Sequence, residues 1–252
     1  MLNKGYYLVE TIQKRYNPDL SVSNGAGIHS VKLVDRFLAD ESRSITLYEA
    51  GVGAGFSAKN FLAHPNVTVR GCDVVVPDTV MELMREYPGR ISVDEATLYD
   101  SLKGIDDGSI DMFYADNVIE HMFPDEFPAI LDLLDTKLKL GAMLFLFIPN
   151  STFGPHDVSL RWLKTGQKAE GLHFMEMSCR GVTDLFGKHG IFPVYFAYRT
   201  VFKKYGCIRD KSGRLSRLKP ILESMSKFLP AFMRKKAEQI FGLHCYILMK
   251  QK

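Results

Sequence analysis

The stretch LYEAGVGAGFSAKN, residues 47–60, decides the fold that we predict for this chain. An apolar run ends in an acid, Glu49, and three glycines then alternate with small residues at Gly51, Gly53 and Gly55. Glycine adopts positive φ angles without steric cost and lets a ligand come close to the backbone. Because a helix-like segment follows, we expect a strand, a tight ligand-binding turn and a helix.

Outward from this turn, segments with strand-like and helix-like patterns alternate along the chain. The predicted strands cover residues 44–49, 67–75, 91–93, 109–116, 142–150, 191–199 and 244–250. The predicted helices cover residues 24–39, 56–62, 77–87, 125–138 and 179–189. Such alternation is typical of an α/β fold with a mostly parallel sheet, which binds ligands at the carboxyl ends of its strands. The polar residues at these ends are Glu49, Asp73, Glu95 and Asn117.

The glycine spacing distinguishes between kinds of cofactor. A phosphate-binding loop needs Lys-Ser/Thr after its glycines, and no such pair follows here. A dinucleotide site needs the pattern G-x-G-x-x-G, but Phe56 occupies the third glycine position and would obstruct a pyrophosphate. Glu49 also lies where a polyanion would be repelled. The turn therefore suits a ligand that is positively charged at this end.

Four segments are similar, in the same order, to motifs of class I S-adenosylmethionine-dependent methyltransferases. The segment EAGVGAG resembles the E/D-x-G-x-G-x-G motif of that family, and Asp73 in RGCDVV matches the acid that ends its second strand. Glu95 and Ala96 match more loosely, because family members often have Asp-Ala there. The segment DNVIEHM resembles the N-x-x-E-H motif of the small-molecule branch. The resemblance covers about residues 28–198.

This resemblance implies a fold, a cofactor and a binding site. The fold is a Rossmann-like, seven-stranded, mostly parallel sheet with helices on both faces and a helical insertion before the last strand. The cofactor is S-adenosyl-L-methionine, which becomes S-adenosyl-L-homocysteine when its methyl group is transferred. Its amino-acid end and ribose need carboxylates, and its adenine needs an apolar slot. The implied cofactor-binding residues are Glu49, Gly51, Gly53, Gly55, Asp73, Glu95, Ala96 and Asn117.

We expect the acceptor chemistry in residues 150–177, which follow the fifth strand and are long for a plain connection. His156 lies directly before an aspartate, and His173 lies three residues before Glu176. A histidine whose tautomer is fixed by a carboxylate is a suitable general base. His156 and His173 are therefore the first catalytic candidates and His121 is the third, with a structural role as the alternative for each. The spacing of these histidines matches no usual metal motif, so we predict no metal.

The charge is unevenly distributed along the chain. Residues 199–252 contain 14 basic and three acidic residues, a net charge of +11, so residues 1–198 carry −8. Apolar residues recur near helical spacing within residues 215–241. These residues are interpreted either as helices that cover the sheet edge or as a peripheral contact of residues 199–242 with an anionic membrane. No nucleic-acid recognition motif accompanies the charge, so we expect no nucleic acid as a partner.

Length and composition indicate which class of protein the chain belongs to and how its domain is organised. A chain of 252 residues with 46% hydrophobic content can bury the core of one domain. We predict an N-terminal helical cap (1–40), a cofactor-binding core (41–198), a basic helical insertion (199–242) and a final strand (243–252). The four cysteines form no C-x-x-C pair, and no apolar run has the length of a signal peptide or a membrane span. We therefore expect a cytoplasmic protein, at the inner face of the membrane if the insertion binds lipid.

The sequence thus predicts methyl transfer from S-adenosylmethionine to a small molecule or glycan, which is lipid-linked if the insertion binds membrane. Oxygen is the preferred acceptor atom and a histidine the general base, with N- and C-methylation left open. The alternative from another class is a methyltransferase-like fold that acts as a binding or scaffold protein. The intact Glu49, glycines and Asp73 argue against a decayed site. Nothing in the sequence indicates the oligomeric state.

Overall fold

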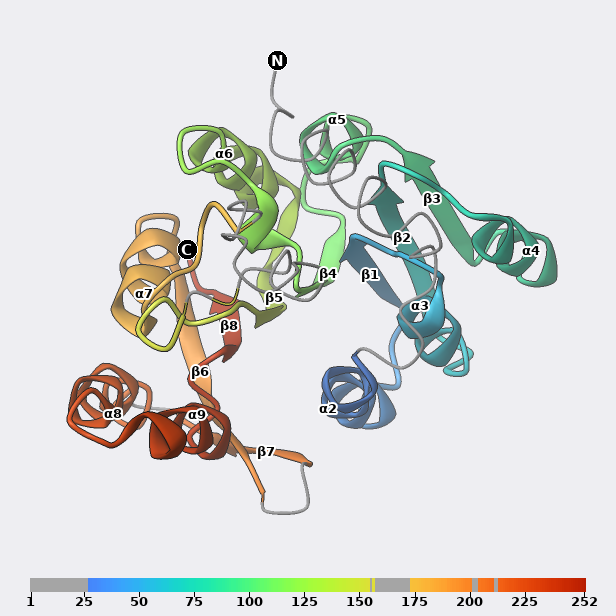
Figure 1. Cartoon of the computed structure of the whole chain (residues 1–252). Helices are drawn as coiled ribbons and strands as arrows, with labels where there is room; N and C mark the ends of the chain where they lie inside the picture. The colour runs from blue at the N-terminus through green and yellow to red at the C-terminus, as the bar shows by residue number, and fades with distance from the viewer. Residues whose placement is uncertain (1–26, 155, 157–172, 201–203, 211–212) are drawn as a thin grey trace, which may run out of the picture.

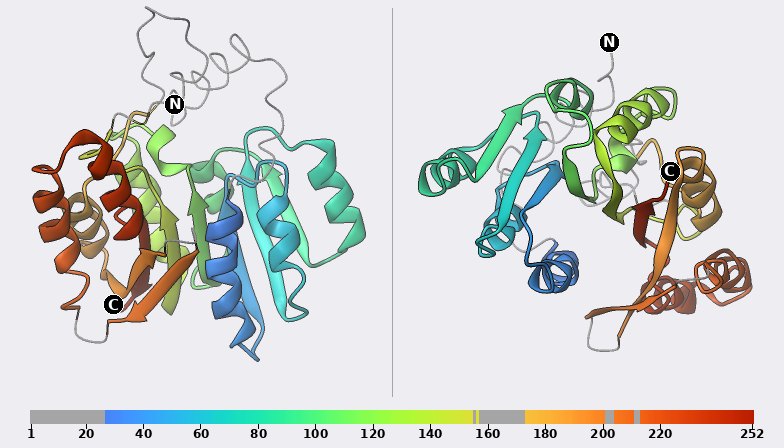
Figure 2. Two further views of the ribbon diagram at one scale, coloured as in Figure 1. Left: turned by 60° about the horizontal axis from the view of Figure 1, so that its bottom comes forward. Right: turned by 180° about the vertical axis from the view of Figure 1, so that it is seen from behind.

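The computed structural model (Figure 1) describes residues 27–154, 156, 173–200, 204–210 and 213–252. These residues contain one eight-stranded sheet in the order β3-β2-β1-β4-β5-β8-β6-β7. Helices pack on both faces of this sheet (Figure 2). The predicted α/β class is therefore confirmed. Residues 1–26 of the predicted helical cap lie outside the described part.

The first five strands form the parallel half of the sheet. They are β1 (Ile45–Ala50), β2 (Val67–Asp73), β3 (Ile91–Glu95), β4 (Ile110–Asp116) and β5 (Leu138–Phe147). Strand β1 pairs with β2 and β4, and β3 and β5 lie outside them. Strand β4 is buried almost throughout because helices cover both of its faces. All five carboxyl ends meet at one edge, where ligands bind in such sheets.

Three antiparallel strands complete the sheet. Strand β8 (Cys245–Lys250) pairs with β5, β6 (Ile191–Arg199) pairs with β8, and β7 (Tyr205–Arg209) pairs with β6. The prediction of seven strands was therefore wrong, because β7 lies in the segment expected to be a helical insertion. Tyr205 packs against Phe147 with ring centroids 5.5 Å apart, so a buried aromatic contact secures this edge strand.

The helices form two layers with separate hydrophobic clusters. One face is covered by α5 (Leu98–Lys103), α6 (Phe127–Lys137) and α7 (Cys179–Gly187). The other face is covered by α2 (Ile28–Ala39), α3 (Phe56–Phe61) and α4 (Asp78–Glu86). Helix α5 was not predicted. It begins after Thr97, whose hydroxyl accepts the backbone N–H of Asp100 at 3.1 Å, an N-cap that compensates for its short length.

Two further helices precede the last strand, as predicted for the basic insertion. They are α8 (Leu218–Ser226) and α9 (Ala231–Ile240), which lie at the β6 side of the sheet in Figure 1. Helix α8 contacts α7, and α9 contacts β6. None of the helices in the described residues is long and apolar enough to cross a membrane. The insertion therefore consists of one edge strand and two surface helices.

Two buried charged side chains attach α8 to the rest of the molecule. The Nζ atom of Lys219 donates hydrogen bonds to the backbone oxygens of Gly242 at 2.6 Å and Cys245 at 2.5 Å. Four residues further along α8, Glu223 accepts the backbone N–H of Cys179 at 2.9 Å and the hydroxyl of Thr152.

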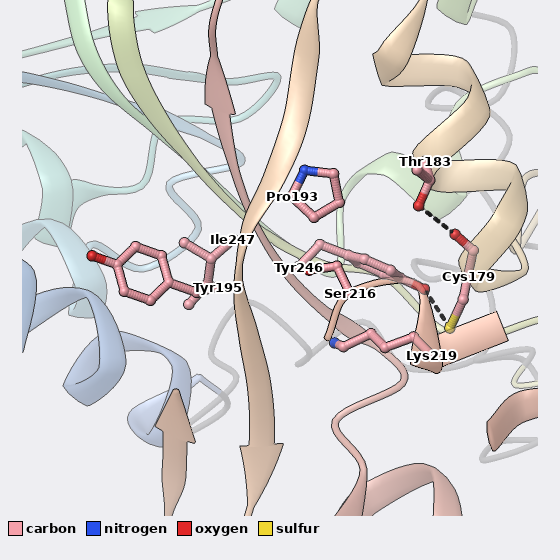
Figure 3. A pocket seen from close by; sticks show the side chains of 8 residues that line it. All are labelled: Cys179, Thr183, Pro193, Tyr195, Ser216, Lys219, Tyr246 and Ile247. Atoms are coloured by element: carbon pink, nitrogen blue, oxygen red, sulfur yellow. Dashed lines mark hydrogen bonds between the residues drawn. The ribbon is translucent and has the colours of Figure 1, made fainter. Parts of the chain in front are cut away.

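A small cleft surrounds Lys219 between α7, β6, β8 and α8 (Figure 3). The side chain of Lys219 lies beside Tyr246, with Nζ 5.1 Å from the ring centroid. The hydroxyl of Tyr246 points toward the Sγ atom of Cys179, 3.5 Å away. None of the residues that line this cleft belongs to the glycine turn, so the cleft is a feature of the α8 attachment.

Candidate functional site

The glycine turn after β1 lies at the carboxyl edge of the parallel strands. Its three glycines have φ angles of 69°, 55° and 81° at Gly51, Gly53 and Gly55, a region that favours glycine. Close packing adds a second requirement at Gly51, where a Cβ would lie 2.5 Å from Cγ2 of Val118. At Gly53 a Cβ would meet no described atom within 4 Å. The turn therefore packs tightly against the segment after β4 and leaves its backbone accessible at Gly53.

Glu49 is the buried acid beneath this turn, with an exposed fraction of 1%. The hydroxyl of Ser57 donates to Oε1, whereas no donor in the described residues reaches Oε2. Burial is the main reason why the pKa of Glu49 rises to about 8, with the Ser57 hydrogen bond opposing the rise and Asp73 and Asp116 adding to it. A buried carboxylate with an unused oxygen suits a cationic donor from a ligand.

Asp73 reaches from the end of β2 to the glycine turn. Its Oδ2 accepts the backbone N–H of Gly53 at 2.8 Å, and its Oδ1 accepts that of Val74 at 2.8 Å. Burial raises the pKa of Asp73 despite these hydrogen bonds. A carboxylate has about four lone-pair sites, so both oxygens retain capacity for ligand hydroxyls. Glu95 is exposed and pairs with Asp73 in the register of β2 and β3, and the N–H of Ala96 donates to the backbone oxygen of Asp73 at 2.9 Å.

Asp116, at the end of β4, is a third acid that the sequence analysis missed. It accepts hydrogen bonds from Ser30 Oγ at 2.5 Å, Tyr114 OH at 3.1 Å and Asn117 Nδ2 at 2.7 Å. Burial nevertheless raises the pKa of Asp116. The predicted Asn117 has a φ of 55°, which is unusual outside glycine and turns the chain sharply at this edge. The signal that was overlooked is an acid directly before Asn117 at the end of a predicted strand.

The structure thus brings the predicted cofactor-binding residues together at one edge of the sheet. Glu49, Asp73 and Asp116 place three carboxyl groups there. Among the salt bridges of the described residues, none involves these three carboxylates. Their pKa values are all raised chiefly by burial. These three carboxyl groups therefore fit a ligand with cationic and hydroxyl groups better than they fit a polyanion.

The three histidines predicted as catalytic candidates form a second group near the end of β4. The Nδ1 atom of His173 lies 3.0 Å from Oε1 of Glu176, and the backbone N–H of His156 donates to the same oxygen at 2.6 Å. The rings of His173 and His121 pack edge to face with centroids 4.9 Å apart. Glu176 therefore contacts the ring of His173 and the backbone of His156, while His121, from a segment far away in the sequence, packs against His173. Asp157, the predicted neighbour of His156, lies outside the described residues.

Glu176 contacts both histidine residues of the segment after β5, the ring of His173 and the backbone N–H of His156. Burial alone would raise the pKa of Glu176, but the hydrogen bonds from His173 and from the backbone N–H of His156 lower it overall. An ionised Glu176 keeps the proton of neutral His173 on Nδ1 and leaves the lone pair on Nε2. The ring of His156 lies near a different acid, because its Nε2 is 3.6 Å from Oε1 of Glu238 in α9.

Glu120, beside His121, is completely buried in a 3₁₀ turn, η1 (Ile119–His121). Its backbone oxygen accepts the N–H groups of Phe174 at 2.7 Å and Met175 at 3.0 Å, which ties η1 to the segment of His173. Both side-chain oxygens lack a donor within the described part of the chain, and burial raises the pKa of Glu120 well above its usual range. The sequence analysis includes Glu120 in the DNVIEHM motif but predicts no role for it.

Comparisons with known proteins find their matches among solved structures. No family model and no curated protein matches the sequence. A Burkholderia thailandensis 1,6-didemethyltoxoflavin-N1-methyltransferase, crystallised with 1,6-didemethyltoxoflavin and S-adenosylhomocysteine, is 14% identical at a TM-score of 0.58, over 97% of this chain and 85% of that chain. An Archaeoglobus fulgidus S-adenosylmethionine-dependent methyltransferase is 16% identical at a TM-score of 0.52, over 98% of this chain and all of that chain. The CurJ carbon methyltransferase is 13% identical at a TM-score of 0.55, over 96% of this chain and 58% of that chain.

These structural neighbours differ in the atom that they methylate, as the N1- and carbon methyltransferases show. At such low identity the likeness concerns the backbone arrangement and not the acceptor. The chain has the fold of S-adenosylmethionine-dependent methyltransferases.

Proposed function

We propose that this chain is a methyltransferase that uses S-adenosylmethionine and acts on a small-molecule or glycan acceptor. The observation that carries the proposal is Glu49, a buried carboxylate with an unused oxygen directly before the glycine turn. The ammonium and sulfonium groups of S-adenosylmethionine supply the positive charge that suits this acidic edge. The motif resemblance and the methyltransferase fold support the same cofactor.

Each predicted residue at the edge has a distinct task in holding the cofactor. Glu49 would bind the amino-acid end through Oε2, and Asp73 would accept the ribose hydroxyls through its remaining lone pairs. The glycine turn would bring the backbone close to the cofactor at Gly53. Glu95 and Ala96 lie where the family resemblance places the adenine. Asn117 would contribute from the end of β4 beside Asp116.

The reaction that we propose is an in-line displacement. A bond forms between the acceptor oxygen and the methyl carbon while the carbon–sulfur bond breaks, and the sulfonium becomes the neutral thioether of S-adenosylhomocysteine. The proton of the acceptor hydroxyl passes to a histidine. Holding nucleophile, carbon and sulfur in line can supply about 7–11 kcal/mol of the rate acceleration. An amine acceptor would need less help from a base, so N-methylation uses the same site with a smaller role for histidine.

Binding of S-adenosylhomocysteine tests the cofactor assignment. Calorimetric titration of the purified protein should give micromolar binding of S-adenosylhomocysteine and no binding of NAD. Asp73→Ala should abolish this binding because the variant loses the carboxylate that also fixes the N–H of Gly53. Asp106→Ala, which removes an exposed carboxylate outside the site, is the matched control and should bind normally. Absence of binding to the wild-type protein would leave a methyltransferase-like binding module.

His156 is the general base that we propose first, with His173 and His121 as the other candidates. His156→Ala should lower turnover by about 100-fold or more with unchanged affinity for S-adenosylhomocysteine, because the acceptor then keeps its proton. His189→Ala, at a partly buried histidine outside the group, is the control. Normal turnover of His156→Ala, measured with the acceptor once it is found, would exclude His156 from proton transfer.

We also propose that the insertion contacts an anionic membrane surface peripherally. Large apolar side chains are exposed on α8, on α9 and between them, with Met225 63%, Phe228 90% and Phe232 71% exposed. Basic side chains are exposed beside them, such as Lys227 and Arg234. Apolar insertion combined with attraction to anionic lipid is the usual mode of such helices. This contact would bring the enzyme to a lipid-linked acceptor.

Co-sedimentation with vesicles tests the membrane contact. The protein should sediment with phosphatidylserine-containing vesicles at low salt, less at high salt, and not with phosphatidylcholine vesicles, because salt screens the electrostatic part. The double variant Phe228→Asp/Phe232→Asp should lose binding at low salt. Leu140→Asp changes an equally exposed apolar residue of β5 and should bind like the wild type. Equal loss in both variants would refute a specific role for α8 and α9.

A further inference from the structure

The proposed cofactor site does not explain why the carboxyl group of Glu120 is buried where it is. Its side chain is completely buried, and neither oxygen meets a donor in the described residues. Burying a carboxylate without a partner costs several kcal/mol, so such a group is usually protonated or bound to a cation. The surroundings of Glu120 decide between these two states.

Two imidazoles lie next to this carboxylate. Ligand atoms of Glu120, His121 and His173 all lie within 4.8 Å of one another. The three residues come from two segments, which the hydrogen bonds from Phe174 and Met175 to the backbone oxygen of Glu120 hold together. A preorganised set of one carboxylate and two imidazoles is a common donor set for divalent transition metals in proteins.

Metal-binding histidines usually form a hydrogen bond through the ring nitrogen that does not bind the metal, and Glu176 is such a partner for His173. Its Oε1 lies 3.0 Å from Nδ1 of His173, so the carboxylate holds the proton on that nitrogen and leaves Nε2 as the metal-binding atom. Metal-ligating histidines almost always donate their other N–H to such an acceptor, which fixes the ring and raises its basicity. A general base would show the same carboxylate–histidine pair, but it would not explain the buried Glu120 beside it.

The geometry points to a divalent transition-metal site formed by Glu120, His121 and His173, with Glu176 as a positioning residue. Zinc or manganese is the class of ion that fits a mixed oxygen and nitrogen donor set. Donors about 2.1 Å from a tetrahedral ion are about 3.4 Å apart, so binding would shorten the distances between the three donor atoms by up to about 1.4 Å. Three protein ligands leave at least one coordination position for water or for an acceptor oxygen.

Such an ion has a clear use beside the proposed methyl-transfer site. A coordinated acceptor hydroxyl loses its proton more readily and is held at a fixed position. Only this use rests on the proposed function, because the binding of the ion can be measured without cofactor or acceptor. The metal site also supports oxygen as the acceptor atom, because a hydroxyl acceptor gains most from coordination.

Metal binding to the full chain tests the inference. After treatment with a chelator and its removal, titration with ZnCl₂ and MnCl₂ should show one bound ion per chain. Glu120→Gln and His173→Ala should each lower the affinity by 100-fold or more, and Glu176→Ala should lower it by about 10–100-fold. His189→Ala, which removes a partly buried histidine outside the cluster, should leave the affinity unchanged.

Two measurements keep the result independent of folding defects and of the cofactor. Co²⁺ added to the wild-type protein should give visible absorption bands of a nitrogen and oxygen site, which needs no variant. S-adenosylhomocysteine should bind to the metal-free protein, so loss of cofactor binding and loss of metal binding are separate failures. Weak binding of several ions, or equal loss in His189→Ala, would overturn the inference. Glu120 would then be a buried, protonated acid.

Discussion

Replacing Glu49 with glutamine should weaken the binding of S-adenosylhomocysteine by about 100-fold. The variant keeps the shape of the side chain and the hydrogen bond with Ser57. It loses the charge that we propose for the cofactor ammonium, and a hydrogen bond to a charged group contributes about 1.5–3 kcal/mol. Calorimetric titration of both proteins at the same pH measures the difference.

The same substitution should stabilise the cofactor-free protein at alkaline pH. Burial raises the pKa of Glu49 from 4.5 to about 8, so between these values the folded state keeps a proton that the unfolded state has released. Stability of the wild type therefore falls as pH rises through this window and levels off above it. Glu49→Gln removes this dependence and should gain about 2–4 kcal/mol at pH 8, which raises Tm by several degrees.

Thermal unfolding at pH 5 and pH 8 separates this effect from a general change in packing. The gain of Glu49→Gln should be small at pH 5 and large at pH 8. Glu82→Gln, at an exposed glutamate of α4, should show neither the gain nor the loss of cofactor affinity. A Glu49→Gln protein that is less stable than the wild type at pH 8 would show that the carboxylate has a cationic partner without cofactor.

Gly51→Ala is the second substitution with a large expected effect, a loss of about 2–5 kcal/mol of unfolding free energy. A left-handed conformation costs an alanine about 1–2 kcal/mol. Its Cβ would also lie 2.5 Å from Cγ2 of Val118, and such overpacking costs about 1–3 kcal/mol more. Because Val118 follows Asn117, the displacement should also lower cofactor affinity. Chemical denaturation and titration with S-adenosylhomocysteine measure the two losses.

Gly89→Ala separates the two contributions. Gly89 has a φ of 76°, close to that of Gly51, but a Cβ there would meet no described atom within 4 Å. This variant should therefore lose about 1–2 kcal/mol from backbone strain alone and bind cofactor normally. If both variants are equally destabilised, the contact with Val118 relaxes without cost and the close approach at Gly51 is unimportant.

The sequence predicts best those features of the fold that depend on residues close together in the chain. The glycine turn and the acid before it follow from residue type and order, and the structure places them as expected; the apolar fifth strand is also present, although it runs from Leu138 to Phe147 and not over residues 142–150. Strand β7 was missed because an antiparallel edge strand depends on its partner β6 and on the contact between Tyr205 and Phe147. Helix α5 was missed because six residues are too few to show a helical period.

The candidate site divides in the same way. Glu49 and Asp73 follow strands in a recognisable order, so their shared edge could be inferred before the structure was known. Asp116 precedes a predicted residue and was passed over, although its burial and three hydrogen bonds give it an equal place at the edge. The grouping of Glu120 with His173 depends on a contact between segments 53 residues apart. No spacing rule within one segment reveals such a contact.

The attachment of α8 through Lys219 and Glu223 has a consequence for how the molecule opens. These two side chains, one helical turn apart, join α8 to β8 on one side and to Thr152 and the first turn of α7 on the other. Local opening of α8 would transfer Lys219 and Glu223 to water but would leave the buried backbone oxygens of Gly242 and Cys245 and the buried N–H of Cys179 without these hydrogen-bond partners, so it costs much more than fraying of a helix held only by surface contacts. The backbone amides of α8 should therefore exchange with solvent more slowly than those of such a helix, although α8 was inserted late in the sequence and lies at the surface.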